Sequence, residues 1–179
     1  MSFEQSPISA VTPHIPIWAQ NLTADCNEVR ANVSARLGVT NSIIVSAVGD
    51  ATIKAMHERV SELEQLARLE IERQPDEIDT DEAVAAFKSI AGEHTPISAN
   101  IWQDEARSRA LLNTTGYDMF AARGQERITA AIARSAMEIE IAARSKNQRL
   151  QAGVQASAAT TAQQLAALAS KDEIGRAHV

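Results

Sequence analysis

The side chains best suited to chemistry in this sequence are three well-separated histidines, His14, His57 and His94. An imidazole titrates near neutral pH and can act as a general base. No nucleophile or metal ligand lies at a useful spacing from any of them. We expect His57 on an exposed helix surface among charged neighbours, and His94 in a turn beside Pro96. These positions predict no catalytic histidine.

Acidic side chains concentrate between Pro75 and Glu82, where five of the eight residues are Asp or Glu. A calcium-binding EF-hand loop needs a turn glycine and a glutamate twelve residues along, and this segment has neither. Asp79 and Glu82 instead have the spacing of a capping box for a helix that begins at Thr80. We therefore predict a local structural role for these acids.

The remaining reactive groups do not complete a site. Cys26 is the single cysteine, so it has no partner for an internal disulfide or a thiolate metal site. Glu138 and Glu140 are two residues apart and point to different sides of a helix. The usual nucleotide-binding and hydrolase motifs are missing. We predict a protein that is not an enzyme and has no catalytic, cofactor-binding or metal-binding residues.

Composition indicates an all-α protein. Only 3% of the 179 residues are aromatic, and the net charge is −6. Small aliphatic side chains favour close packing of helix on helix, and a negative charge disfavours general affinity for nucleic acid or acidic membranes. No run of 18 apolar residues and no signal peptide are present. We expect no membrane span, and a cytoplasmic protein or one assembled into a particle.

The first 113 residues divide into an arm and a short-helix bundle. Residues 1–20 contain three of the five prolines and predict an extended arm that lays Trp18 on the bundle. Residues 21–113 predict the bundle, with Gly92 and Pro96 separating its last two helices. Its helices are expected from about Asn21 to Leu37, Ser42 to Arg73, Thr80 to Ala91 and Ala99 to Leu112.

Residues 114–172 predict one long alanine-rich helix for oligomerisation. Between Asp118 and Ser170 the chain has 16 alanines and no proline. Such a helix is about 80 Å long at 1.5 Å per residue, so most of it needs a partner helix. Trp102, Tyr117 and Phe120 flank the turn before this helix, and we expect these aromatic residues to meet there.

The bulky residues of this helix follow an 11-residue repeat, which is coiled-coil-like but favours a straight bundle. Alanine is so common here that some alanines fall on any face by chance, so the branched residues carry the pattern. We expect an oligomer seam, with copies of the same chain or other helices as partners. The seam residues are Ile128, Ile132, Ile139, Leu150, Val154 and Leu165.

Charge is distributed unevenly along the chain. Residues 1–100 carry 7 basic and 15 acidic side chains, whereas residues 101–172 carry 9 and 7. Subunits could pair acidic half against basic half, or the basic face of residues 123–149 could contact phosphates. The possible phosphate contacts are Arg123, Arg127, Arg134, Arg144, Lys146 and Arg149.

Residues 173–179 resemble the translation of a sequencing adapter, and we set them aside from reasoning about the fold. On this interpretation the natural chain continues beyond about Asp172, which re-sequencing of the gene can check.

The function expected from these features is non-enzymatic structural or assembly work by a helical oligomer. The composition is similar to that of alanine- and glutamine-rich helical proteins of phage particles, such as internal virion or ejection proteins, and of secretion machines. No motif carries this analogy. The alternative is a nucleic-acid-binding or regulatory helical module that uses the basic face of residues 123–149.

Overall fold

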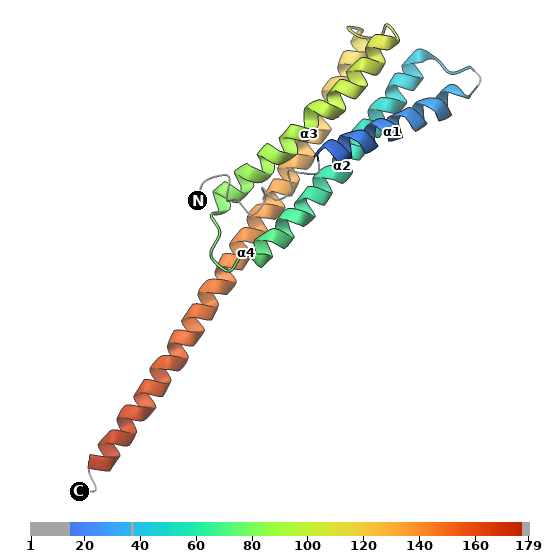
Figure 1. Ribbon diagram of the computed structural model, residues 1–179. Coiled ribbons are helices and arrows are strands. Elements are labelled where there is room, and N and C mark those ends of the chain that lie inside the picture. Colours follow the sequence, from blue (N-terminus) through green and yellow to red (C-terminus); the bar gives the residue numbers. More distant parts are fainter. Residues whose placement is uncertain (1–14, 37, 177–179) are drawn as a thin grey trace.

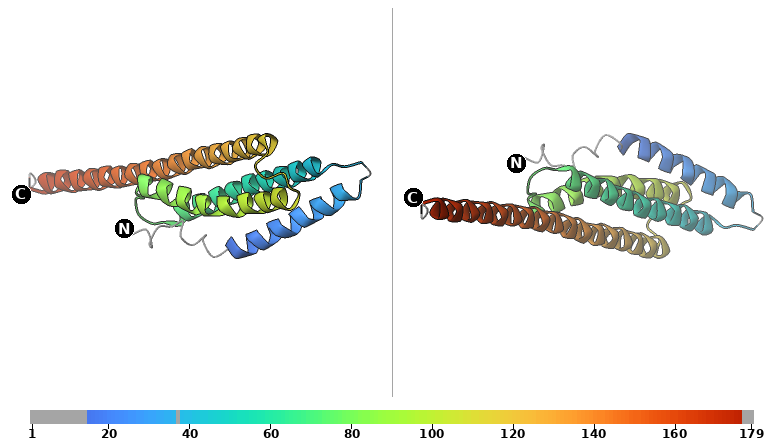
Figure 2. Two further views of the ribbon diagram at one scale, coloured as in Figure 1. Left: turned by 90° about the horizontal axis from the view of Figure 1, so that it is seen from above. Right: turned by 90° about the horizontal axis from the view of Figure 1, so that it is seen from below.

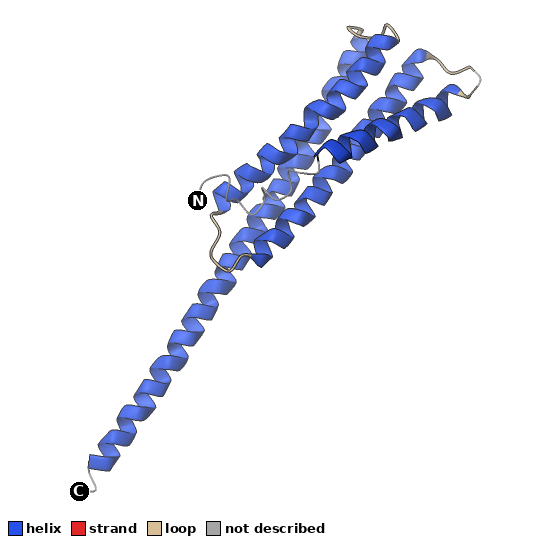
Figure 3. Cartoon of the chain, in the orientation of Figure 1, coloured by secondary structure: helices blue, strands red, loops and turns tan. Residues whose placement is uncertain are grey.

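The computed structural model describes residues 15–36 and 38–176, and over these residues the chain forms four α-helices and no strand (Figure 3). The prediction of an all-α fold is confirmed. The helices are α1 (Ile15–Ser34), α2 (Asn41–Arg73), α3 (Thr80–Ser108) and α4 (Thr115–Arg176).

Successive helices run in opposite directions. Helices α2 and α3 lie in the middle, with α1 on one side of this pair and α4 on the other (Figure 2). Helix α4 has 62 residues, about twice the length of its neighbours, and its C-terminal part runs alone beyond the end of the bundle (Figure 1). The chain is therefore a helical bundle with a single-helix extension.

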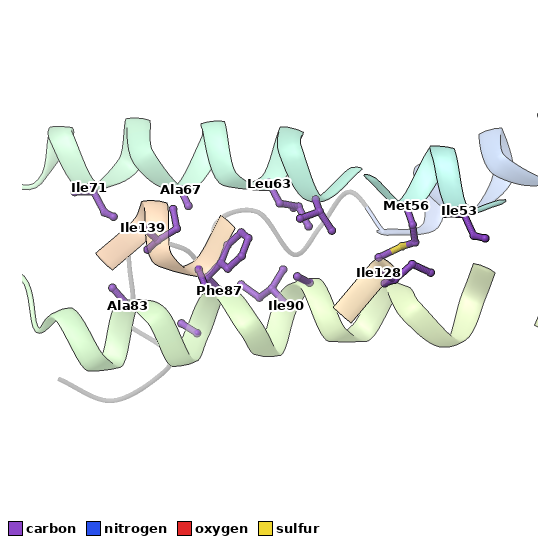
Figure 4. Close-up of a cluster of buried hydrophobic side chains, with 14 of the residues drawn as sticks. Ile53, Met56, Leu63, Ala67, Ile71, Ala83, Phe87, Ile90, Ile128 and Ile139 are labelled. Atoms are coloured by element: carbon purple, nitrogen blue, oxygen red, sulfur yellow. The ribbon is translucent and has the colours of Figure 1, made fainter. Parts of the chain in front are cut away.

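The main core lies between α2, α3 and α4 (Figure 4). Fully burying one branched or aromatic side chain contributes roughly 1.5–3 kcal/mol, so Ile128 and Ile139 make the first half of α4 a part of the bundle core together with α2 and α3. A smaller cluster joins α1 to α2 through Leu22, Cys26 and Val48. The large buried residues of the main core include Met56, Leu63, Ile71, Phe87, Ile90, Ile128 and Ile139.

Trp102 of α3 lies in a slot between two helical glycines, Gly49 of α2 and Gly124 of α4. A Cβ atom added to Gly124 would be 2.7 Å from Cζ3 of Trp102, and one added to Gly49 would lie even closer to the ring. The edge of Trp102 also meets Tyr117, with ring centroids 5.9 Å apart. This pair forms the expected aromatic contact, whereas Phe120 is about half exposed.

Helix α3 is continuous, so the predicted break between Gly92 and Pro96 is wrong. A proline inside a helix costs about 3 kcal/mol because a backbone hydrogen bond is lost and the ring crowds the preceding turn. Here the buried face continues through the proline, from Phe87 and Ile90 to Trp102 and Ala106. Packing on both sides of Pro96 outweighs its local preference.

The boundaries of the other helices agree more closely with the sequence. Helix α2 begins within one residue of the prediction, and the Asp79 carboxylate caps α3 by accepting from the backbone N–H of Asp81 and Glu82, each at 3.0 Å. Helix α1 begins at Ile15, so residues 15–20 are helical and not part of an extended arm. Pro16 falls in the first turn, where a helix tolerates proline. Residues 1–14 of the predicted arm lie outside the described residues.

Candidate functional site

The most unusual surface is the part of α4 beyond Leu150. Every residue from 151 to 168 is exposed, including Val154, Leu165 and Leu168 at 69%, 62% and 61%. No charged residue occurs between Leu150 and Ser170. We call residues 151–168 the α4 extension. It is an uncharged helix. Gln151 at its start donates to the Glu77 carboxylate, between α2 and α3, at 3.0 Å, and the rest of the helix projects beyond the end of the bundle (Figure 1).

The six predicted seam residues become more exposed toward the end of the bundle. Burial decreases from Ile128 and Ile139, which are buried, through Ile132 and Leu150, which are partly buried, to Val154 and Leu165, which are exposed. Helices α2 and α3 of the same chain cover Ile128 and Ile139. Val154 and Leu165 remain exposed and can contact another molecule.

Three of the six predicted phosphate contacts are engaged within the chain. Arg144 and Arg149 form ion pairs with Glu140 at 2.5 Å and Glu72 at 2.6 Å. Lys146 is buried, and its ammonium donates to the carbonyl oxygens of Ile71, at 2.6 Å, and of Gln74.

The Lys146 ammonium therefore stabilises the C-terminal end of α2, where a positive charge is favourable. Its neighbour Asn147 holds the next loop: its side chain accepts from the N–H of Ile78 at 2.9 Å and donates to the carbonyl of Ile78 at 2.8 Å. Together the two residues fasten the connection between α2 and α3 to α4.

The other three basic residues, Arg123, Arg127 and Arg134, are exposed on α4. In the described part of the chain no carboxylate lies within ion-pair distance of them. Arg127 and Arg134 line a groove of about 660 Å³ between α2 and α4, whereas Arg123 lies outside it. From α2 the groove is lined by residues that include His57 and Arg68.

Sequence reasoning missed this groove. The seven-residue spacing of Arg127 and Arg134 puts both on one face of a helix, but the opposing residues of α2 depend on how the two helices pack. His57 was expected on a solvated surface. It is partly buried instead, and its Nε2 atom is buried without a hydrogen-bond partner.

His94 lies fully buried inside α3 and not in a turn. Its Nδ1 donates to the carbonyl oxygen of Ile90 at 2.8 Å, Arg59 donates to its Nε2 at 3.3 Å, and its ring meets Trp18 at 5.0 Å between centroids. Burial lowers the pKa of His94, and the charge of Arg59 acts in the same direction. A neutral, enclosed imidazole of this kind holds α1, α2 and α3 together.

Two further buried polar groups are structural. The Glu105 carboxylate accepts from Arg109 at 2.5 Å and from Arg30 at 2.7 Å, which ties α1 to α3. Burial alone would raise the pKa of Glu105, but the hydrogen bonds from Arg109 and Arg30 outweigh it and hold the pKa below its usual value. Burial raises the pKa of Cys26 to about 11, so its thiol is protonated and unreactive at neutral pH.

Comparison of the chain with protein-family models, with curated protein sequences and with solved structures finds no match. Across the described residues, no three His, Cys, Asp or Glu side chains are grouped to hold a metal ion. None of the described helices combines the length and the apolar character needed to cross a membrane. The fold defines an all-α helical bundle, and its two candidate sites are the α4 extension and the groove between α2 and α4.

Proposed function

We propose that this chain is a non-enzymatic structural or assembly protein that forms a helical oligomer through the α4 extension. One observation carries the proposal: residues 151–168 are helical, uncharged and exposed along their whole length. The bundle of α1 to α3 and the first half of α4 acts as the base from which this helix projects.

The extension has an apolar face that needs a partner. Helical spacing places Val154, Leu165 and Leu168 on one side, in line with Leu150 and with the face of α4 that packs in the bundle. Alanine favours the helix itself, but an isolated helix of this length is only marginally stable in water. Packing two such helices together buries the exposed leucines and stabilises both.

A second copy of the chain is the partner that we propose. The extension has no charged residue, so the extensions of two copies do not repel each other electrostatically. Ile128, Ile139 and Leu150 are spaced by 11 residues, and we expect a repeat of this length to favour straight, shallow packing along the extension. Oligomerisation through such a helix suits a component of a phage particle or of a secretion machine.

The face of the extension can be tested with charge substitutions. We expect Val154→Asp with Leu165→Asp to convert the oligomer into a monomer, because each subunit would bring two carboxylates into an apolar contact. Size-exclusion chromatography with light scattering measures the change in mass. Circular dichroism checks that the bundle remains folded.

The matched control puts the same two charges on the opposite side of the same helix, as Ala156→Asp with Gln163→Asp. Both positions are exposed, so the cost to helix propensity is similar. We expect this variant to keep the mass of the unaltered protein. Equal dissociation of both variants would show that the apolar face is not the contact.

A nucleic-acid-binding role is the second candidate, supported by the exposed and unpaired Arg123, Arg127 and Arg134. Their spacing of four and seven residues places the three guanidinium groups along one face of α4. Three phosphate contacts correspond to a slope of about −3 in a plot of log affinity against log salt for duplex DNA.

A further inference from the structure

We propose that the groove between α2 and α4 binds a small phosphorylated molecule, with Arg127 and Arg134 as its phosphate-binding residues. Both arginines line the groove and have no ion-pair partner in the described chain. They are two helical turns apart, about 10 Å along the axis. Two long side chains at this separation can close on one phosphate from opposite sides.

The acidic residues of the groove are already engaged. Arg68 lies 3.3 Å from a carboxylate oxygen of Glu64 and 3.8 Å from one of Glu138. The hydroxyl of Ser135 donates to the other oxygen of Glu64 at 2.7 Å. The single negative charge left in this cluster is exceeded by the two charges of Arg127 and Arg134, so the groove favours an anion.

His57 supplies a second, independent indication of a ligand. Its Nε2 atom is buried with no hydrogen-bond partner, and the residue lines the same groove. A buried polar atom without a partner costs free energy unless something fills the position. A ring nitrogen of histidine can donate to a phosphate oxygen, so a ligand that draws the His57 ring toward the groove would satisfy this atom.

The size of the groove indicates more than a bare phosphate. Its volume of about 660 Å³ is within the range of pockets that hold small organic ligands. Hydroxyls and carboxylates at Ser61, Glu64 and Glu138 line it beside the small apolar Ala130 and Ala131. These groups suit an organic part that carries hydroxyl groups, such as a phosphorylated sugar.

Binding can be measured by titration calorimetry with inorganic phosphate, ribose 5-phosphate and ribose. We expect ribose 5-phosphate to bind more tightly than phosphate, and ribose without its phosphate to show no binding. The double substitution Arg127→Gln with Arg134→Gln is expected to weaken binding by about tenfold or more. Exposed arginines can be replaced without loss of the fold, which circular dichroism confirms.

Arg123→Gln is the control, because it removes the same charge from the same helix outside the groove. We expect its affinity for ribose 5-phosphate to stay near that of the unaltered protein. If Arg123→Gln lowered the affinity as much as the double substitution, binding would belong to a diffuse basic face and the proposal would be overturned. The proposal would also be overturned if neither phosphate nor ribose 5-phosphate bound to the unaltered protein. The oligomeric state is measured separately, so failure of phosphate binding would not test the proposed oligomer, and a monomeric mass would not test the phosphate site.

Discussion

Replacing Gly124 with alanine is expected to destabilise the protein by about 1–3 kcal/mol, because the new methyl group would overlap the ring of Trp102. The added Cβ would also lie 2.9 Å from Cδ1 of Ile53. Gly49 lies against the other edge of the ring, so the ring has little room to shift toward α2. Chemical denaturation followed by circular dichroism measures the change in the free energy of unfolding.

Replacing Gly92 with alanine is expected to have the opposite effect on the free energy of unfolding. A Cβ atom at Gly92 meets nothing within 4 Å, and alanine in a helix interior is favoured over glycine by about 0.5–1 kcal/mol. We therefore expect this variant to be more stable than the unaltered protein. If Gly124→Ala behaved in the same way, Trp102 would not be held in the slot described here.

Ile139→Ala is expected to cost about 2–5 kcal/mol of the free energy of unfolding, because Ile139 is fully buried between α2, α3 and α4. Ile141 offers a matched control two residues along the same helix, with 58% of its surface exposed. Its replacement by alanine should change stability by less than about 0.5 kcal/mol. Thermal or chemical unfolding of both variants makes the comparison.

The Ile139→Ala variant also distinguishes a seam residue packed within its own subunit from one packed between subunits. If Ile139 packs inside its own subunit, Ile139→Ala lowers the stability of the bundle and leaves the oligomer mass unchanged. A variant with normal stability and a lower oligomer mass would instead place Ile139 between subunits, as the full six-residue seam predicts.

Much of the fold could be predicted from the sequence, because local patterns determine it. The expected bounds of α2, Ser42 to Arg73, agree with the structure to within one residue, and the Asp79 cap follows from side-chain chemistry alone. Pro96 misled the prediction of α3. A proline rule describes one backbone hydrogen bond, whereas the continuity of α3 depends on contacts with α2 and α4 on both sides of that residue.

The candidate sites were harder to predict, because the same spacing of apolar residues on a helix is expected for packing within one chain and for packing between chains. Ile139 and Leu165 belong to one pattern, yet the bundle covers the first and leaves the second exposed. Lys146 looks in sequence like an exposed basic residue, and only the position of the end of α2 shows why it is buried. The packing of Trp102 between Gly49 and Gly124 could not be predicted, because the only trace of it in the sequence is two glycines inside helices.

The most direct test of the proposed assembly role is sedimentation equilibrium of the unaltered chain over a range of micromolar concentrations. The exposed α4 extension predicts a mass that is a multiple of the 19.3 kDa of one chain and that falls on dilution. A constant mass of 19.3 kDa at every concentration would contradict self-association through α4.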